Sequence, residues 1–215
     1  MKDIDYYEAA DKAISEMNRD AQREFGKLKA AKFDEINVIQ RVTTLYRTQA
    51  KKARRRYFEV GFEGYLLGLF LCEVTGDKAY RMAEDAITLE WVDAILKGVD
   101  PVTQYSFENE TERKAHRLEE ALSVTEATGP EIDKALRIWS KQTGQYAICV
   151  TDDAIMEAFE DAGIDDVMWI TARDEKVCDE CRPRDGKIYK RSELPKKHWG
   201  CRCKVVPVIR TEGDA

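Results

Sequence analysis

The segment from Val177 to Cys203 constrains the fold of this chain most, because it holds four of the six cysteines and one of the two histidines. Cys178 and Cys181 form a C-x-x-C pair, and His198, Cys201 and Cys203 follow after sixteen intervening residues. Two short groups of sulfur and nitrogen ligands, brought together by a hairpin, are typical of a structural zinc site. We therefore expect Zn²⁺ to be bound by Cys178, Cys181 and Cys201, with either His198 or Cys203 as the fourth ligand.

Short runs rich in β-branched residues flank this segment and indicate strands. They are VMWIT at 167–171 and CKVVPVI at 203–209, and KIY at 187–189 follows the turn sequence Asp185-Gly186. The rest of the chain has the apolar period of helices, which we expect at 3–25, from about 34 into the run 61–72, and at 77–97, 105–122, 128–146 and 151–162. Gly26 is the expected end of the first helix. Gly61, Gly64 and Gly68 either break the second helix or allow another backbone to approach closely.

The predicted fold class is therefore α+β, with long N-terminal helices and then a helical segment packed on a small C-terminal β-structure that carries the Cys/His cluster. Gly98 and Pro101 indicate a boundary near residue 100. We expect a helical docking region at 1–100 and a second domain at 101–215.

The cysteines could also form a disulfide, remain free thiols or act as a redox pair, and the redox state of the cellular compartment helps to decide among these. The N-terminus lacks the apolar core of a signal peptide, and the longest apolar run, Tyr65 to Cys72, is far shorter than the roughly 20 residues of a membrane helix. We expect a soluble protein made in a reducing cytoplasm, where metal binding is favoured over a disulfide or free thiols. A thioredoxin-like redox pair is disfavoured because the C-x-x-C precedes a turn instead of opening a helix. A catalytic zinc would need an open coordination position, which five candidate ligands can fill.

A second candidate site is a basic stretch without any acidic residue from Ile36 to Phe58, in a chain whose net charge is −6. Its candidate binding residues are Arg47, Lys51, Lys52, Arg54, Arg55 and Arg56, with Arg41 further upstream. Such a stretch indicates contact with DNA or with an acidic protein surface. The alternative is an ordinary solvated helix face.

The C-terminal string VMWITARDEKVCDECRPRDGKIY, followed by LPKKHWGCRCKVVPV, resembles the phage Mu F-like minor head proteins of tailed phages and prophages. The matching features include Trp169, Asp185-Gly186 and the H-x-x-C-R-C element that begins at His198. The resemblance extends over about residues 100–209. The first C-x-x-C is missing from many relatives, so the zinc prediction depends on the spacing in this sequence.

The resemblance implies a non-enzymatic minor capsid protein of the virion, associated with the portal and acting in head assembly, DNA packaging and ejection. The implied partners are the portal, major capsid and scaffold proteins, and packaged double-stranded DNA, with no membrane. The implied location is the head interior or the vicinity of the portal, after assembly in the host cytoplasm. The alternatives are a zinc-stabilised nucleic-acid-binding protein that acts alone, and a zinc hydrolase.

Overall fold

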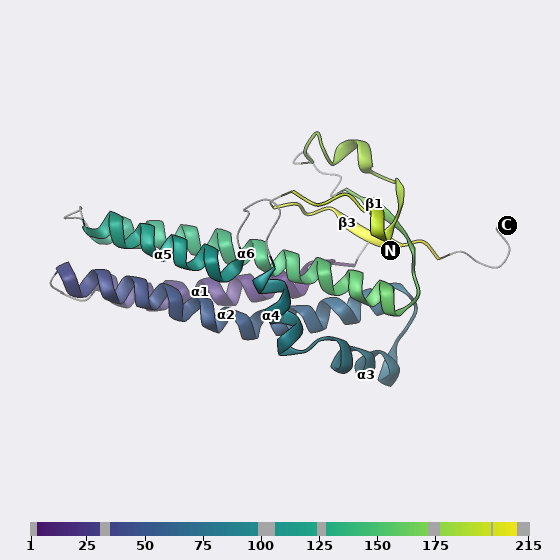
Figure 1. Ribbon diagram of the computed structural model, residues 1–215, viewed down its shortest axis with the longest axis horizontal. Helices are drawn as coiled ribbons and strands as arrows, with labels where there is room; N and C mark the ends of the chain where they lie inside the picture. The colour runs from purple at the N-terminus through teal and green to yellow at the C-terminus, as the bar shows by residue number, and fades with distance from the viewer. Residues whose placement is uncertain are drawn as a thin grey trace. The chain divides into compact units, whose positions relative to one another are not determined.

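The chain forms helices first and a small sheet last. The structure is a computed structural model, and it describes residues 4–30, 35–98, 106–123, 128–171, 177–198 and 200–209. Within these ranges there are six α-helices and a three-stranded antiparallel sheet, which confirms the predicted α+β class (Figure 1). The helices are α1 (Glu8–Ala30), α2 (Glu35–Leu71), α3 (Gly76–Ala86), α4 (Leu89–Lys97), α5 (Phe107–Ser123) and α6 (Thr128–Asp161). The strands are β1 (Asp166–Ile170), β2 (Ile188–Lys190) and β3 (Lys204–Pro207). None of the described helices combines the length and apolarity needed to cross a membrane.

Two compact units divide the chain, and each draws on separate stretches of sequence. Unit 1 comprises residues 1–7, 61–87 and 151–215, and unit 2 comprises 8–60 and 88–150. Helices α2 and α6 therefore contribute residues to both units. The domain boundary expected at residues 100 and 101 lies outside the described residues and stays a prediction.

A buried polar network fixes three helices of unit 2 against one another. The Tyr46 hydroxyl of α2 donates to Gln142 Oε1 of α6 at 2.8 Å, and Gln142 Nε2 donates to Thr111 Oγ1 of α5 at 2.7 Å. All three side chains are buried. A shift of one helix would leave buried polar groups unpaired, so the network favours a single register. Helix α5 and the first part of α6 run side by side in opposite directions (Figure 1).

Glycines allow α2 and α6 to approach closely within unit 1. A Cβ on Gly64 would lie 3.3 Å from the Ala154 Cβ, and one on Gly68 would lie 2.6 Å from the Ala158 Cβ. Helix α2 continues through Gly61 without a break, so close approach is the correct alternative for this glycine-rich run. Helix α6 ends at Asp161. The left-handed Gly163 that follows turns the chain, and the Ile164 amide donates to the Phe159 carbonyl at 2.8 Å.

Three helix boundaries differ from those expected from the sequence. Helix α1 continues past Gly26, which is exposed and has no neighbouring atoms that require a bend. The helix expected at 77–97 is two helices, because the Thr88 hydroxyl caps α4 by accepting from the Trp91 amide at 3.1 Å. The helices expected at 128–146 and 151–162 form one helix, since the buried face continues through Ala147 and Val150.

The sheet has the order β2-β1-β3, with both pairs antiparallel, and confirms the three predicted strands. In β1, Val167 and Trp169 are buried, and the other three residues are partly exposed. The turn before β2 has Gly186 at a φ of 73°, and the Gly186 amide donates to the Trp169 carbonyl at 2.8 Å. The sheet thereby holds the segment between β1 and β3, which carries the Cys/His cluster.

Candidate functional site

A tight turn positions the first two cysteines. The amides of Cys181 and Arg182 donate to the Cys178 carbonyl at 3.1 and 3.0 Å, and the Cys181 amide also points at Cys178 Sγ at 3.4 Å. Pro183 has no amide to donate to sulfur and lies instead in the short 3₁₀ turn Arg182–Arg184. The C-x-x-C pair is therefore held by backbone hydrogen bonds among residues that precede Pro183 in the sequence.

The second arm of the cluster returns through another turn. Gly200 has a φ of 72°, and the Cys201 amide donates to the His198 carbonyl at 3.1 Å. Cys201 and Cys203 are both buried, as is Cys181, with exposed fractions of 3%, 4% and 1%. Cys178 and His198 are partly exposed. All five predicted ligands come from the segment between β1 and β3.

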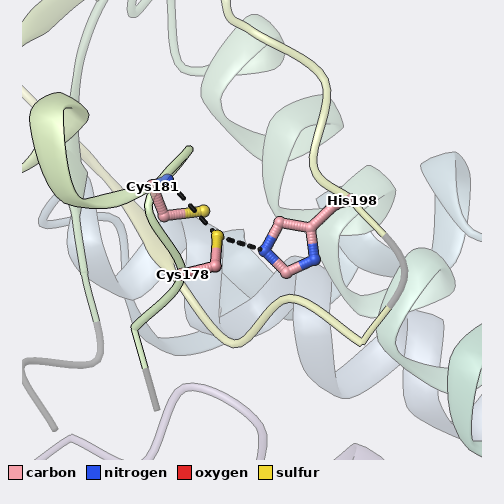
Figure 2. Close-up of side chains that lie close together, drawn as sticks. All are labelled: Cys178, Cys181 and His198. Atoms are coloured by element: carbon pink, nitrogen blue, oxygen red, sulfur yellow. Dashed lines mark hydrogen bonds between the residues drawn. The ribbon is translucent and has the colours of Figure 1, made fainter. Parts of the chain in front are cut away.

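Two overlapping groups of three ligand atoms result, and Cys181 belongs to both. Cys178, Cys181 and His198 form one group, and Cys181, Cys201 and Cys203 form the other, with the ligand atoms of each group within 4.8 Å of one another. Cys178 Sγ lies 3.0 Å from His198 Nε2, and Cys181 Sγ lies 3.8 Å from Cys201 Sγ. Figure 2 shows Cys178 and Cys181 on one chain segment with the His198 ring facing them from another.

The donor types fit zinc, and the spacing fits it in part. Zinc–sulfur bonds of about 2.3 Å in a tetrahedron place two sulfurs about 3.8 Å apart, which is the separation of Cys181 and Cys201. The Cys178–His198 pair is closer than a tetrahedral sulfur–nitrogen edge of about 3.5 Å. No four of the described ligand atoms all lie within 4.8 Å of one another. Binding one Zn²⁺ through four of them therefore requires a small shift of the Cys178–Cys181 turn or of the segment from His198 to Cys203 toward the other.

The cysteine thiols have different acidities. Burial acts to raise the pKa of Cys178, but hydrogen bonds to its sulfur from the amides of Cys181 and Glu180 and the nearby His198 ring outweigh burial, so the pKa is lowered. Burial raises the pKa of Cys181, and the neighbouring cysteines raise it further. Burial also raises the pKa of Cys201. Without a bound cation, Cys178 is thus the thiol most readily deprotonated of these three.

A polar network that the sequence did not reveal supports the return arm. The Tyr7 hydroxyl lies 2.9 Å from the Cys203 carbonyl oxygen and 3.0 Å from Asp152 Oδ1. Lys197 Nζ, one residue before His198, donates to Asp152 at 2.6 Å and to the Tyr7 hydroxyl at 3.0 Å. Burial raises the pKa of Tyr7, which keeps its hydroxyl protonated as a donor. The N-terminal segment and α6 thereby hold both ends of the H-x-x-C-x-C element.

The basic stretch lies on α2, and three of its six candidate residues pair with acids in unit 2. Arg47 pairs with Glu112 of α5 at 2.9 Å, Arg54 binds both carboxylate oxygens of Asp93 of α4, and Arg56 contacts Glu16 of α1 and Glu59. Lys51, Lys52 and Arg55 are exposed and form no ion pair within the described part of the chain. Acidic residues therefore neutralise three of the six candidate binding residues of the basic stretch, and we call the side of α2 that carries these six residues the basic face.

Comparison with known proteins gives a family match for residues 111–206, to the family described as Phage Mu protein F like protein. The match begins in α5, includes α6 and the whole Cys/His cluster, and ends in β3. No curated protein and no solved structure matches the chain.

Proposed function

We propose that this chain is a phage head morphogenesis protein and virion component, and more specifically a structural minor capsid protein associated with the portal, because residues 111–206 match the phage Mu F-like family. In this role it acts in head assembly and in DNA packaging and ejection. Its partners are the portal, capsid and scaffold proteins, in the head interior or near the portal. The family match is the observation that carries the proposal.

The Cys/His cluster serves this role as a structural zinc site and not as a catalytic centre. Cys181 is a ligand, and three of Cys178, His198, Cys201 and Cys203 complete the set. A bound Zn²⁺ supplies a cross-link between the turn after β1 and the arm before β3. The two groups that share Cys181, together with the 3.8 Å sulfur separation, support this assignment. Because side chains can fill all four positions, no open position remains for substrate, and the protein acts by assembly.

The basic face on α2 contacts packaged DNA or an acidic partner. The exposed cations Lys51, Lys52 and Arg55 support this proposal, because they form no ion pair among the described residues. They also favour a second candidate function, a zinc-stabilised nucleic-acid-binding protein that acts without a capsid. In that case the isolated chain binds duplex DNA, and its affinity falls steeply with salt.

Co-expression with the portal protein from the same phage tests the proposed function. We expect the chain to co-purify with the portal at moderate salt and to be incorporated into procapsids. A matched sample with a truncated portal rim serves as the control for nonspecific capture. Salt-sensitive DNA binding without any portal or procapsid association would instead establish the second function.

A further inference from the structure

A cavity of about 390 Å³ lies within unit 2, between α2, α4 and α5. Its walls carry both charged and apolar side chains. They are Arg47, Ala50, Lys51, Arg54, Asp93, Leu96, Lys97, Phe107, Glu108, Thr111 and Glu112. The volume is within the range of sites that receive a side chain or a small ligand. The cavity therefore includes part of the predicted basic face but is not a uniformly basic surface.

The floor of the cavity is apolar and its arginines are held in place. Ala50, Leu96 and Phe107 are buried and provide the apolar lining. Arg47 and Arg54 are each bound by both oxygens of one carboxylate, from Glu112 and Asp93. Paired charges of this kind contribute little net attraction for a further anion, but their positions are fixed.

Two ammonium groups at the cavity remain available to a ligand. Lys51 and Lys97 are exposed, and neither forms an ion pair within the described part of the chain, although Lys97 lies near enough to Asp93 to stabilise its negative charge. Of the three carboxylates in the lining, Glu108 forms no ion pair with a described residue, whereas Asp93 and Glu112 are paired. The lining thus has two unpaired positive charges and one unpaired negative charge. A ligand that places carboxylates at the two lysines and an apolar group on the floor would match this distribution.

We infer that this cavity binds an acidic, carboxylate-bearing segment of a partner protein that inserts one apolar side chain between α2, α4 and α5. This inference depends on the proposed function, in which the chain works by docking on other head components. Duplex DNA fits the site less well, because its sugar-phosphate backbone has no apolar side chain to place on the apolar lining. The structure thus favours a protein partner over DNA for this part of the basic face.

Fluorescence anisotropy with the purified full-length chain tests the inference. The probes are a labelled helical peptide with Glu residues and one Leu on the same face, the same peptide with Leu replaced by Ser, and labelled duplex DNA. The double variant Lys51→Glu with Lys97→Glu changes the cavity. Lys12→Glu with Lys141→Glu is the matched control, since it makes the same charge change at exposed lysines of unit 2 that neither line the cavity nor belong to the basic stretch. Thermal unfolding verifies that both variants are folded.

We expect the Glu/Leu peptide to bind, the Ser peptide to bind less tightly, and the cavity variant to weaken binding about tenfold or more, because two attractions become repulsions. The control variant should retain most of the affinity. Absence of peptide binding would overturn the inference, as would equal weakening by both variants or a preference for DNA. Portal co-purification is a separate readout, so it can succeed while the cavity inference fails.

Discussion

At the scale of single residues, Cys181 is the centre of the Cys/His cluster. It is the most buried of the candidate ligands and belongs to both groups of ligand atoms. Whichever fourth ligand completes the site, Cys181 remains in the set. Its role can therefore be tested without first deciding between His198 and Cys203.

Cys181→Ser should abolish stoichiometric zinc binding and lower the free energy of unfolding by more than about 3 kcal/mol, because the metal couples to folding. The measurement is the zinc-to-protein ratio by elemental analysis, together with urea unfolding. Cys72→Ser is the matched control, since Cys72 follows the last residue of α2 and lies outside both ligand groups. Full zinc occupancy in Cys181→Ser would contradict the assignment.

Tyr7→Phe should destabilise the protein by about 1–2 kcal/mol, because it removes a hydroxyl that contacts Asp152 and the Cys203 carbonyl. The loss should be larger when zinc is bound than after chelation, since Tyr7 supports the ligand arm. Urea unfolding with and without a chelator measures both values. Tyr80→Phe is the control, because Tyr80 is 57% exposed. Equal effects of the two substitutions would show that Tyr7 does not support the arm.

Sequence reasoning found the candidate ligand residues but not the residues that support them. Cysteine and histidine spacing is a local signal, and it identified all five side chains that the fold brings together. Tyr7 and Asp152 are remote from the cluster in sequence, so no local pattern connects them with Cys203. The same holds for the acids Glu112 and Asp93, which pair with arginines of the basic stretch.

At the scale of helices and strands, glycine has opposite effects at two positions. Gly68→Ala should destabilise the protein by roughly 2 kcal/mol or more, because its Cβ would lie 2.6 Å from the Ala158 Cβ. Gly26→Ala should stabilise it by about 0.5–1 kcal/mol, since Gly26 is helical and nothing lies within 4 Å of the new Cβ. Thermal unfolding of both variants checks the signs. Stabilisation by Gly68→Ala would refute the close approach of α2 and α6.

Glu110 should make α5 sensitive to pH. Burial acts to raise its pKa, but hydrogen bonds from Lys114 and Arg113 outweigh this and lower it. A lowered folded-state pKa means that the stabilisation is present above the unfolded value of about 4.3 and is lost as pH falls through the folded value. Glu110→Gln should therefore cost about 1–2 kcal/mol at neutral pH and less in acid, as measured by urea unfolding across pH. A pH-independent loss for Glu110→Gln would contradict the assigned cause.

The elements themselves were largely predictable, and their ends were less so. Apolar periodicity located the helices, and β-branched runs with Asp185-Gly186 located the strands. The break before α4 depends on one hydroxyl, that of Thr88, within a continuous helical period. Gly26 did not end α1, because a helix tolerates glycine where no positive φ is required.

At the scale of the whole molecule, sequence order and compact units do not coincide. Each unit takes residues from both halves of the chain, and the family-matched stretch contributes to both. Such an arrangement depends on contacts between residues far apart in sequence, which composition and periodicity cannot reveal. The family match, the Cys/His cluster and the exposed cations of the basic stretch are the observations that support the proposed function.

Quantitative mass spectrometry of purified heads tests this function most directly. Heads from the phage that encodes this chain, freed of tails and host debris, should contain it at a small fraction of the major capsid protein, and heads made after its deletion should lack it and show a packaging or ejection defect. If wild-type heads contain none of the chain and the deletion mutant assembles, packages and infects normally, the chain is not a minor head protein.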